Sequence, residues 1–222
     1  MLRLASSSPR RVQLLRLLDI PFETTAPNVD EARAASPALA KAIAAARPGE
    51  VTVAADTEVE LEGERVGKPA DESHAIAMLA TLSGREHVVR TDVVVVAASG
   101  ARKHFAVRSR VSMRELSLRQ IERYAATGEP LDKAGAYAIQ GEGRRVVESF
   151  DGCLANITGL PLCHLYFALR RVGVVPSERP EVVCQRHFDF TCPVWRAAQR
   201  QGRVLRDGAD YRSWSEDVAG LE

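Results

Sequence analysis

The chain has 222 residues, 45% of them hydrophobic and 27% charged, which is typical of one sizeable α/β domain with or without an appendage. Lys and Arg number 30 and Asp and Glu 29, so the net charge of +1 gives no reason to expect nucleic-acid or membrane binding. No apolar run is long enough to span a bilayer, Ser-Pro-Arg-Arg interrupts the apolar start too early for a signal peptide, and four cysteines are too few for a disulfide scaffold. We therefore expect a reduced cytoplasmic protein.

Apolar periodicity and turn residues divide the chain into alternating strands and helices. The first half predicts a strand over 2–5, a helix over 10–18 capped by Ser8, an extended segment over 20–29, a helix over 30–46, a strand over 51–55 and a hairpin over 59–66. The second half predicts a helix over 71–82, strands over 87–97 and 105–113, and helices over 117–126 and 162–172. This alternation predicts one α/β domain over 1–175 with a mostly central sheet. Residues 176–222 are richer in Arg and aromatics and less periodic, and we expect a C-terminal extension of unknown role.

The turn after the first strand, Ser6-Ser7-Ser8-Pro9-Arg10-Arg11, combines hydroxyl groups with two guanidinium groups. The first backbone N–H groups of a helix have no helical partner, and the helix dipole adds partial positive charge there. Such a turn can cradle a phosphate, and arginine can bind its oxygens in bidentate fashion. The same short pattern also suits a plain helix cap with two solvated arginines.

Three other places carry groups that could complete a phosphate site. Asp56 follows the strand 51–55, where α/β sheets place ligands, and its carboxylate could hold a divalent cation or accept a proton from water. Glu31 and Lys68 add an acid and a point charge near predicted strand ends. Gln140 follows a tight loop that is expected to feed a short strand, and its amide can both donate to and accept from a base. Each feature alone is equally compatible with a turn cap, surface charge or a packed loop.

Seven segments occur in a fixed order: L-A-S-S-S-P-R-R, V-D-E, A-A-D-T, G-K-P, L-S-G-R-E-H, E-P-L-D-K-A-G-A-Y-A-I-Q-G and A-N-I-T-G-L-P-L. Together they resemble the Maf family of nucleoside triphosphate pyrophosphatases over about residues 2–172. The resemblance implies hydrolysis between the α and β phosphates with a divalent cation, Mg²⁺ or Mn²⁺, as a nucleotide-pool house-cleaning activity. It also implies a two-lobed Maf/ITPase-like fold, with an extended mixed sheet flanked by helices, a substrate cleft and often a homodimer.

The same resemblance assigns roles to individual residues. Asp56 is similar to the family's proton acceptor, and the metal ligands would be Glu31 and Asp56. The positions that bind the substrate would be Ser6, Ser8, Arg11, Lys41 and Lys68, with Lys133 as a further cation. Base selection would fall to Arg10, Thr57 and Gln140. The form L-D-K-A-G-A-Y-x-I-Q-G resembles the branch that acts on dTTP and UTP.

The chain departs from the family pattern at three places. The segment between Glu31 and Asp56 is shorter than usual, which affects the placement of Lys41. Asp92 stands where glycine is usual and would weaken anion binding if it faced the cleft, and Cys153 replaces a usual serine. Two other functions stay open: a nucleotide-binding regulator of cell division or septum formation with little catalysis, and a pyrophosphatase for modified or other nucleotides.

A structural zinc site in the C-terminal extension is a further alternative. Cys184, His187 and Cys192 could offer three zinc ligands, but their spacing is irregular and a fourth ligand is missing.

Overall fold

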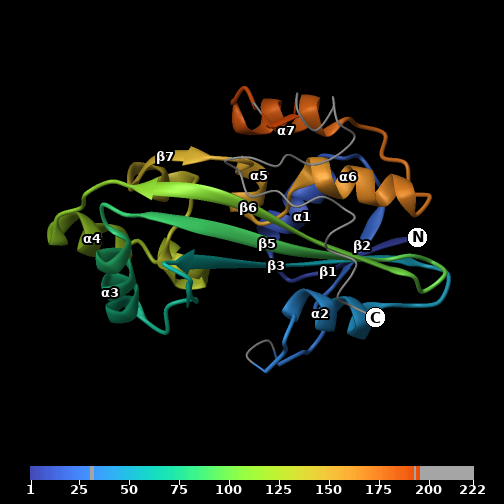
Figure 1. The fold of residues 1–222 in the computed structure, drawn as a ribbon, viewed down its shortest axis with the longest axis horizontal. Helices are drawn as coiled ribbons and strands as arrows, with labels where there is room; N and C mark the ends of the chain where they lie inside the picture. The colour runs from blue at the N-terminus through green and yellow to red at the C-terminus, as the bar shows by residue number, and fades with distance from the viewer. Residues whose placement is uncertain (31–32, 193, 196–222) are drawn as a thin grey trace.

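The structure is a computed structural model and describes residues 1–30, 33–192 and 194–195. A seven-stranded mixed sheet runs through it in the order β2-β1-β3-β5-β6-β7, with β4 paired to β3 (Figure 1). The strands are β1 (Leu2–Ala5), β2 (Phe22–Thr25), β3 (Val51–Leu61), β4 (Glu64–Val66), β5 (Glu86–Val96), β6 (Arg102–Met113) and β7 (Val147–Asp151). β1 pairs in parallel with β2 and β3, and all other pairs are antiparallel.

Helices cover both sides of this sheet and one of its ends. They are α1 (Pro9–Arg16), α2 (Pro37–Ala45), α3 (Glu72–Leu82), α4 (Leu118–Ala125), α5 (Leu154–Thr158), α6 (Leu162–Arg171) and α7 (Pro180–Phe188). Three short 3₁₀ helices are η1 (Glu129–Asp132), η2 (Ala134–Ala136) and η3 (Gly141–Arg145). In Figure 1, α6 and α7 lie on the opposite side of the sheet from α2, while α3 and α4 gather near one end of β5 and β6.

Two groups of apolar clusters divide the molecule into two lobes that share the long strands. In lobe 1, α1 and α6 pack on one face of the sheet through residues such as Leu15 and Leu165, and α2 packs on the other. In lobe 2, α3 and α4 pack on the far ends of β3, β5 and β6 through Leu79 and Ile121. The expected α/β class, with a central mixed sheet flanked by helices, is therefore confirmed.

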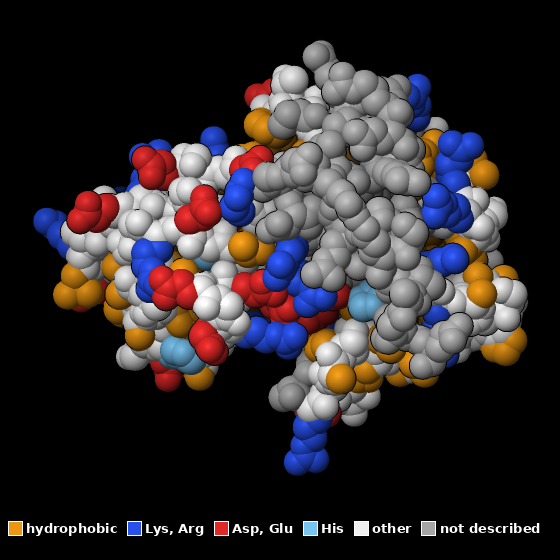
Figure 2. Space-filling view, in the orientation of Figure 1, with side chains coloured by type: hydrophobic (Ala, Val, Ile, Leu, Met, Phe, Trp, Pro, Cys, Tyr) orange, Lys and Arg blue, Asp and Glu red, His pale blue; other side chains and the backbone are white. Residues whose placement is uncertain are grey.

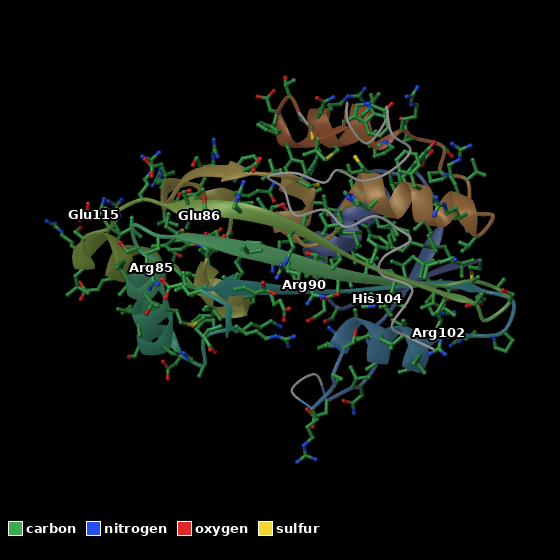
Figure 3. The ribbon with its side chains drawn as sticks, in the orientation of Figure 1. Arg85, Glu86, Arg90, Arg102, His104 and Glu115 are labelled. Atoms are coloured by element: carbon green, nitrogen blue, oxygen red, sulfur yellow. The ribbon has the colours of Figure 1, made fainter. Side chains whose placement is uncertain are left out.

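Over part of their length, the strands β3, β5 and β6 alternate between a buried face and a charged face, as the period of two in a strand requires. Where α2 covers the sheet, the second face of β3 and β5 is apolar and also buried. On the buried face, Val53, Val93 and Val107 belong to the core of lobe 1. On the charged face, Arg90 donates to Glu58 at 2.9 Å and to Asp92 at 2.8 Å, and His104 lies 2.9 Å from Asp92 (Figure 3). In the middle of Figure 2, acidic and basic side chains lie side by side, so positive and negative charges on this face largely neutralise each other.

Most predicted elements are confirmed, but three expectations were wrong. The helix expected over 30–46 begins only at Pro37, because Ser36 is extended and caps it by accepting from Leu39 N at 3.3 Å. The strand expected to end at Ala55 continues to Leu61, since β5 offers it an antiparallel partner beyond the end of β1. Ser8 is the N-cap residue of α1, as expected, although its side chain makes no capping hydrogen bond. Gln140 is followed by η3 rather than by a strand.

The described part of the expected extension packs on lobe 1. Helix α7 lies beside α6 in Figure 1, and Cys184 and Val194 belong to the same core cluster as Leu165 and Leu169. No helix within the described residues has the length and apolarity that a membrane crossing needs.

Two buried histidines make the free energy of unfolding depend on pH. His87 lies against Tyr137, with Nε2 2.7 Å from the hydroxyl oxygen, and His164 stacks on Phe105. Burial lowers the pKa of His87 to about 4 and that of His164 to about 3. In the unfolded chain a histidine titrates near pKa 6.5, so below that pH the unfolded state binds protons that the folded state refuses. Stability is therefore fully present above about pH 6.5 and falls as the pH falls toward 4.

We predict that His164→Phe reduces this loss. Between pH 7 and pH 5 each buried histidine should cost about 2 kcal/mol of unfolding free energy, so the variant should lose about 2 kcal/mol less than the wild type. Urea unfolding at the two pH values measures the difference. His74→Asn, a change at an exposed histidine, serves as the control. The same pH dependence in His164→Phe and in the wild type would contradict the prediction.

Candidate active site

A cleft of about 460 Å³ is lined by residues of both lobes. This volume lies within the range of small-molecule sites. Lobe 1 contributes the turn Ser6–Arg11, Lys41 of α2 and the turn after α5. Lobe 2 contributes Lys68 and much of the segment from Glu129 to Gly141. Of the predicted site residues, the structure brings together Ser6, Ser8, Arg10, Arg11, Lys41, Asp56, Thr57, Lys68 and Gln140. Glu31 lies outside the described residues.

Asp56 and Lys41 form an ion pair in the wall of the cleft. Lys41 Nζ lies 3.0 Å from Asp56 Oδ1, and the side chains are only 8% and 21% exposed. Helix α2 can approach β3 closely because its contact face consists of small residues such as Ala38 and Ala42, which pack against Ala54. The shortened segment before Asp56 therefore still places Lys41 in the site. With so little water around it, the pair is held more strongly than a surface salt bridge.

Asp56 lies inside β3 rather than beyond its end, and the sheet still leaves it accessible. The parallel pairing of β1 with β3 stops at Ala5 opposite Ala54, two residues before Asp56. From Ser6 onward the chain turns away from the sheet, so the turn Ser6–Arg11 begins beside Asp56. This is where the parallel part of the sheet gives way to the antiparallel part. The carboxylate and the hydroxyl-rich turn consequently share the same cleft.

Asp92 lies opposite Asp56 in the register of β3 and β5. Like charges in directly opposite positions repel, and here each carboxylate has its own cationic partner. Asp92 is held by Arg90 at 2.8 Å and by His104 at 2.9 Å, while Asp56 faces Lys41. Asp92 is not among the residues that line the cleft. Asp92 therefore does not face the cleft, and the condition under which we expected it to weaken anion binding is not met.

Arg11 ties the Ser6–Arg11 turn to the rest of lobe 1. Its Nε donates to the carbonyl oxygen of Gly159 at 3.0 Å, one terminal nitrogen donates to Thr57 Oγ1 at 3.1 Å, and the other lies 3.5 Å from Ser6 Oγ. Gly159 adopts a φ of +119° next to these groups, a region that favours glycine. The guanidinium thus fixes the serine and threonine hydroxyls of the cleft relative to each other.

Arg10 reaches across the cleft to lobe 2. Its guanidinium lies 3.2 Å from Asp132 Oδ2, and Lys133 Nζ lies 2.6 Å from Asp132 Oδ1. Burial acts to raise the pKa of Asp132, but the hydrogen bond from Lys133 and the charge of Arg10 outweigh it and hold that pKa below its usual value. Asp132 therefore neutralises two cations at the cleft when no ligand competes for them. Asp132 belongs to the motif E-P-L-D-K-A-G-A-Y-A-I-Q-G, but the sequence alone did not predict a role for it.

The part of the cleft formed by lobe 2 is tied to Lys68 through the backbone. Gly135 N donates to the carbonyl oxygen of Gly67 at 2.9 Å, next to Lys68. Glu129 also lines the cleft, and its Oε2 accepts from Gly143 N at 2.9 Å. Among the described residues, five cationic side chains and three carboxylates line the cleft, so these residues contribute an excess of positive charge. Sequence reasoning missed Glu129, because nothing in its neighbours indicates that the carboxylate turns back onto a glycine amide.

The described residues fit a metal shared with a ligand better than a closed metal centre. Among them, no group of three or more His, Cys, Asp or Glu could hold a metal ion. The zinc alternative at Cys184, His187 and Cys192 gains no support, and the four cysteines are free thiols. Mg²⁺ in nucleotide sites is commonly held by one or two carboxylates together with phosphate oxygens. Asp56, which shares the cleft with the Ser6–Arg11 turn, could provide such a carboxylate.

Comparison with known proteins finds one matching family model and several similar proteins. The family model described as Maf-like protein matches residues 1–172. A dTTP/UTP pyrophosphatase of Xanthomonas oryzae pv. oryzae is 49% identical over 189 residues, covering 78% of this chain and 99% of the relative. A dTTP/UTP pyrophosphatase of Myxococcus xanthus is 44% identical over 185 residues, covering 78% and 93%. The crystal structure of a nucleoside-triphosphatase from Mycobacterium abscessus aligns with a TM-score of 0.36 and 19% identity, over 52% of this chain and 74% of that chain.

We predict that Arg11→Lys destabilises the ligand-free protein. An ammonium cannot reproduce the guanidinium bonds to Gly159 O and Thr57 Oγ1, so the free energy of unfolding should fall by about 1–3 kcal/mol. Arg10→Lys is the matched control, because the Arg10–Asp132 pair is mostly exposed and should change stability by less than about 0.5 kcal/mol. Urea unfolding without nucleotide measures both. Equal stability of the two variants would refute this role of Arg11.

Proposed function

The chain belongs to the Maf-like protein family, and on that premise we propose that it hydrolyses nucleoside triphosphates, dTTP and UTP above all, to the monophosphate and pyrophosphate. The observation that carries the proposal is the Lys41–Asp56 pair, set in a cleft whose other cations are Arg10, Arg11, Lys68 and Lys133. A carboxylate that can accept a proton and a set of cations that can bind phosphates are the two things this reaction needs.

The cations of the cleft bind the triphosphate. At the start of α1 the backbone N–H groups have no helical acceptor, and Ser6 and Ser8 add hydroxyls beside them. Arg11 orients this turn, while Lys68 brings a point charge from lobe 2. Arg10 and Lys133 share Asp132 in the ligand-free chain, and phosphate oxygens can take its place. Binding therefore draws the two lobes toward the same ligand.

Asp56 takes the proton from the attacking water. Lys41 fixes one oxygen of its carboxylate at 3.0 Å, which leaves the other oxygen for the cleft side. Asp56 and, by the family resemblance, Glu31 would hold a divalent cation, Mg²⁺ or Mn²⁺, which supplies charge neutralisation on the phosphates and lowers the pKa of a bound water. Lys41 and Asp56 together define where the water is deprotonated.

Arg10, Thr57 and Gln140 select the base. The Gln140 amide is exposed in the lobe 2 part of the cleft and can both donate and accept, as a pyrimidine edge requires. Arg10 lines the same cleft from lobe 1, and Thr57 is held by Arg11 and by Thr91, whose Oγ1 lies 2.9 Å away. We assign catalysis to residues 1–175, with 176–222 as a C-terminal extension of unknown role, and place the enzyme in the cytoplasm as a homodimer.

We predict that Asp56→Asn lowers kcat for dTTP and UTP by about 10²–10⁴-fold while nucleotide binding is kept. Asparagine has the same shape but cannot take the proton. Pyrophosphate release from a panel of nucleoside triphosphates, with Mg²⁺ and with Mn²⁺, measures the loss. Glu60→Gln is the control, because Glu60 lies on the same strand and pairs with Arg108 outside the cleft.

Three other outcomes would change the proposal. An active Asp56→Asn variant would place the proton acceptor elsewhere. Release from nucleotides with another base would keep the mechanism and overturn the assignment of base selection. Nucleotide binding by the wild type without any turnover would favour the regulator of cell division.

A further inference from the structure

The segment Ala138–Gly143, which carries Gln140, is anchored to lobe 2 at both of its ends. Ala138 N donates to the hydroxyl oxygen of Tyr124 at 3.1 Å. Gly143 N donates to Glu129 Oε2 at 2.9 Å. Tyr124 belongs to α4 and Glu129 opens η1, so two separate elements hold one short loop. Gln140 projects from the middle of that loop into the cleft.

The loop packs directly on the atoms that anchor it. Gly141 has a φ of +63°, and a Cβ at this position would clash with Glu129 Oε1. A Cβ at Gly143 would clash with the carbonyl oxygen of Ala138 and with the Tyr124 hydroxyl. The two ends of the loop thus meet around Tyr124 and Glu129, with no room for side chains between them. This closeness restricts the backbone on either side of Gln140.

The anchors themselves are firmly held. Tyr124 is 5% exposed in the core of lobe 2, and α4 begins with a capping box formed by Ser117 and Gln120. Burial above all, with the Glu129 carboxylate acting in the same direction, raises the pKa of Tyr124 well above its usual value. The tyrosine hydroxyl therefore keeps its proton, which can point to Glu129 while its oxygen accepts from Ala138. The two anchors act as one unit.

The position of Glu129 calls for such a role. Its carboxylate lines a cleft that is built for an anion, where a negative charge works against binding. The Gly143 amide satisfies that carboxylate and turns it toward the loop rather than toward the ligand. The hydrogen bond from Gly143 explains why a carboxylate occurs at position 129: it anchors the loop that carries Gln140.

We propose that Tyr124 and Glu129 are positioning residues that fix the Gln140 loop and thereby set the selectivity for the base. The proposal rests on the proposed function, in which Gln140 reads the base. An amide on a fixed loop discriminates between bases because it cannot move to suit the wrong one, whereas an amide on a loose loop can. Loss of an anchor should therefore reduce the difference between nucleotides more than it reduces turnover of the preferred one.

The test compares kcat/KM for dTTP and UTP with kcat/KM for dCTP and dGTP in four variants. Tyr124→Phe and Glu129→Ala each remove one anchoring hydrogen bond, and each should lower the selectivity ratio by about two- to tenfold. In both variants, kcat for the preferred nucleotide should stay within about threefold of the wild-type value. Glu129→Gln keeps an acceptor oxygen and should retain most of the selectivity. Glu122→Gln, on the exposed face of α4, should match the wild type.

The ratio separates positioning from a general structural effect, because partial unfolding lowers kcat/KM for all nucleotides alike. Unchanged ratios in Tyr124→Phe and Glu129→Ala, with a selective wild type, would overturn the anchoring role and leave the proposed function intact. Should the wild type turn over nothing, the proposed function fails, and the same ratios are then taken from Kd values, with the same expectations. A wild type that neither turns over nor binds with any base preference would overturn both.

Discussion

The ion pair between Lys41 and Asp56 is the constraint on which the rest of the site depends. A nearly buried ammonium must have a partner close by, and Asp56 provides it at 3.0 Å. To meet this condition, α2 must lie close over β3, which small residues such as Ala38 and Ala42 allow. β3 must also continue past the end of β1, so that Asp56 lies beside the Ser6–Arg11 turn rather than under a neighbouring strand. The order of strands and the composition of one helix therefore determine where the Asp56 carboxylate lies.

Around this pair, the ligand-free protein compensates its cations with its own groups. Asp132 faces Arg10 and Lys133, and Arg11 is bound to Gly159 and Thr57. The two arrangements differ in exposure: the bonds of Arg11 are partly buried and lie within lobe 1, while the pair of Arg10 with Asp132 is more exposed and joins the two lobes. A strongly anionic ligand can replace the exposed carboxylate of Asp132 more easily than it can replace the partly buried bonds of Arg11. We therefore expect Arg11 to keep its partners when a ligand binds, and Arg10 to exchange Asp132 for the ligand.

Much of the fold follows from local sequence. The run of β-branched residues in 87–97 and the period of two in 105–113 identify two central strands, and Ser117 with Gly128 bounds α4 closely. The motifs also locate most residues of the cleft, because a phosphate-binding turn has a recognisable composition. The continuation of β3 to Leu61 escapes such reasoning, since it depends on pairing with β5 across more than thirty residues of chain. The contacts of Tyr124 and Glu129 with the Gln140 loop, and of Arg11 with the Gly159 carbonyl, escape it as well. Each joins residues far apart in the chain, and nothing in the local sequence predicts that they meet.

The central claim is that one carboxylate, Asp56, deprotonates water in a cleft that cleaves between the α and β phosphates. The most direct measurement is the identity of the products formed from dTTP, followed by ³¹P NMR as substrate is consumed by the wild type. The account predicts dTMP and pyrophosphate in equal amounts from the first turnover. Release of dTDP with inorganic phosphate would contradict it, because the cleft would then act on the terminal phosphate.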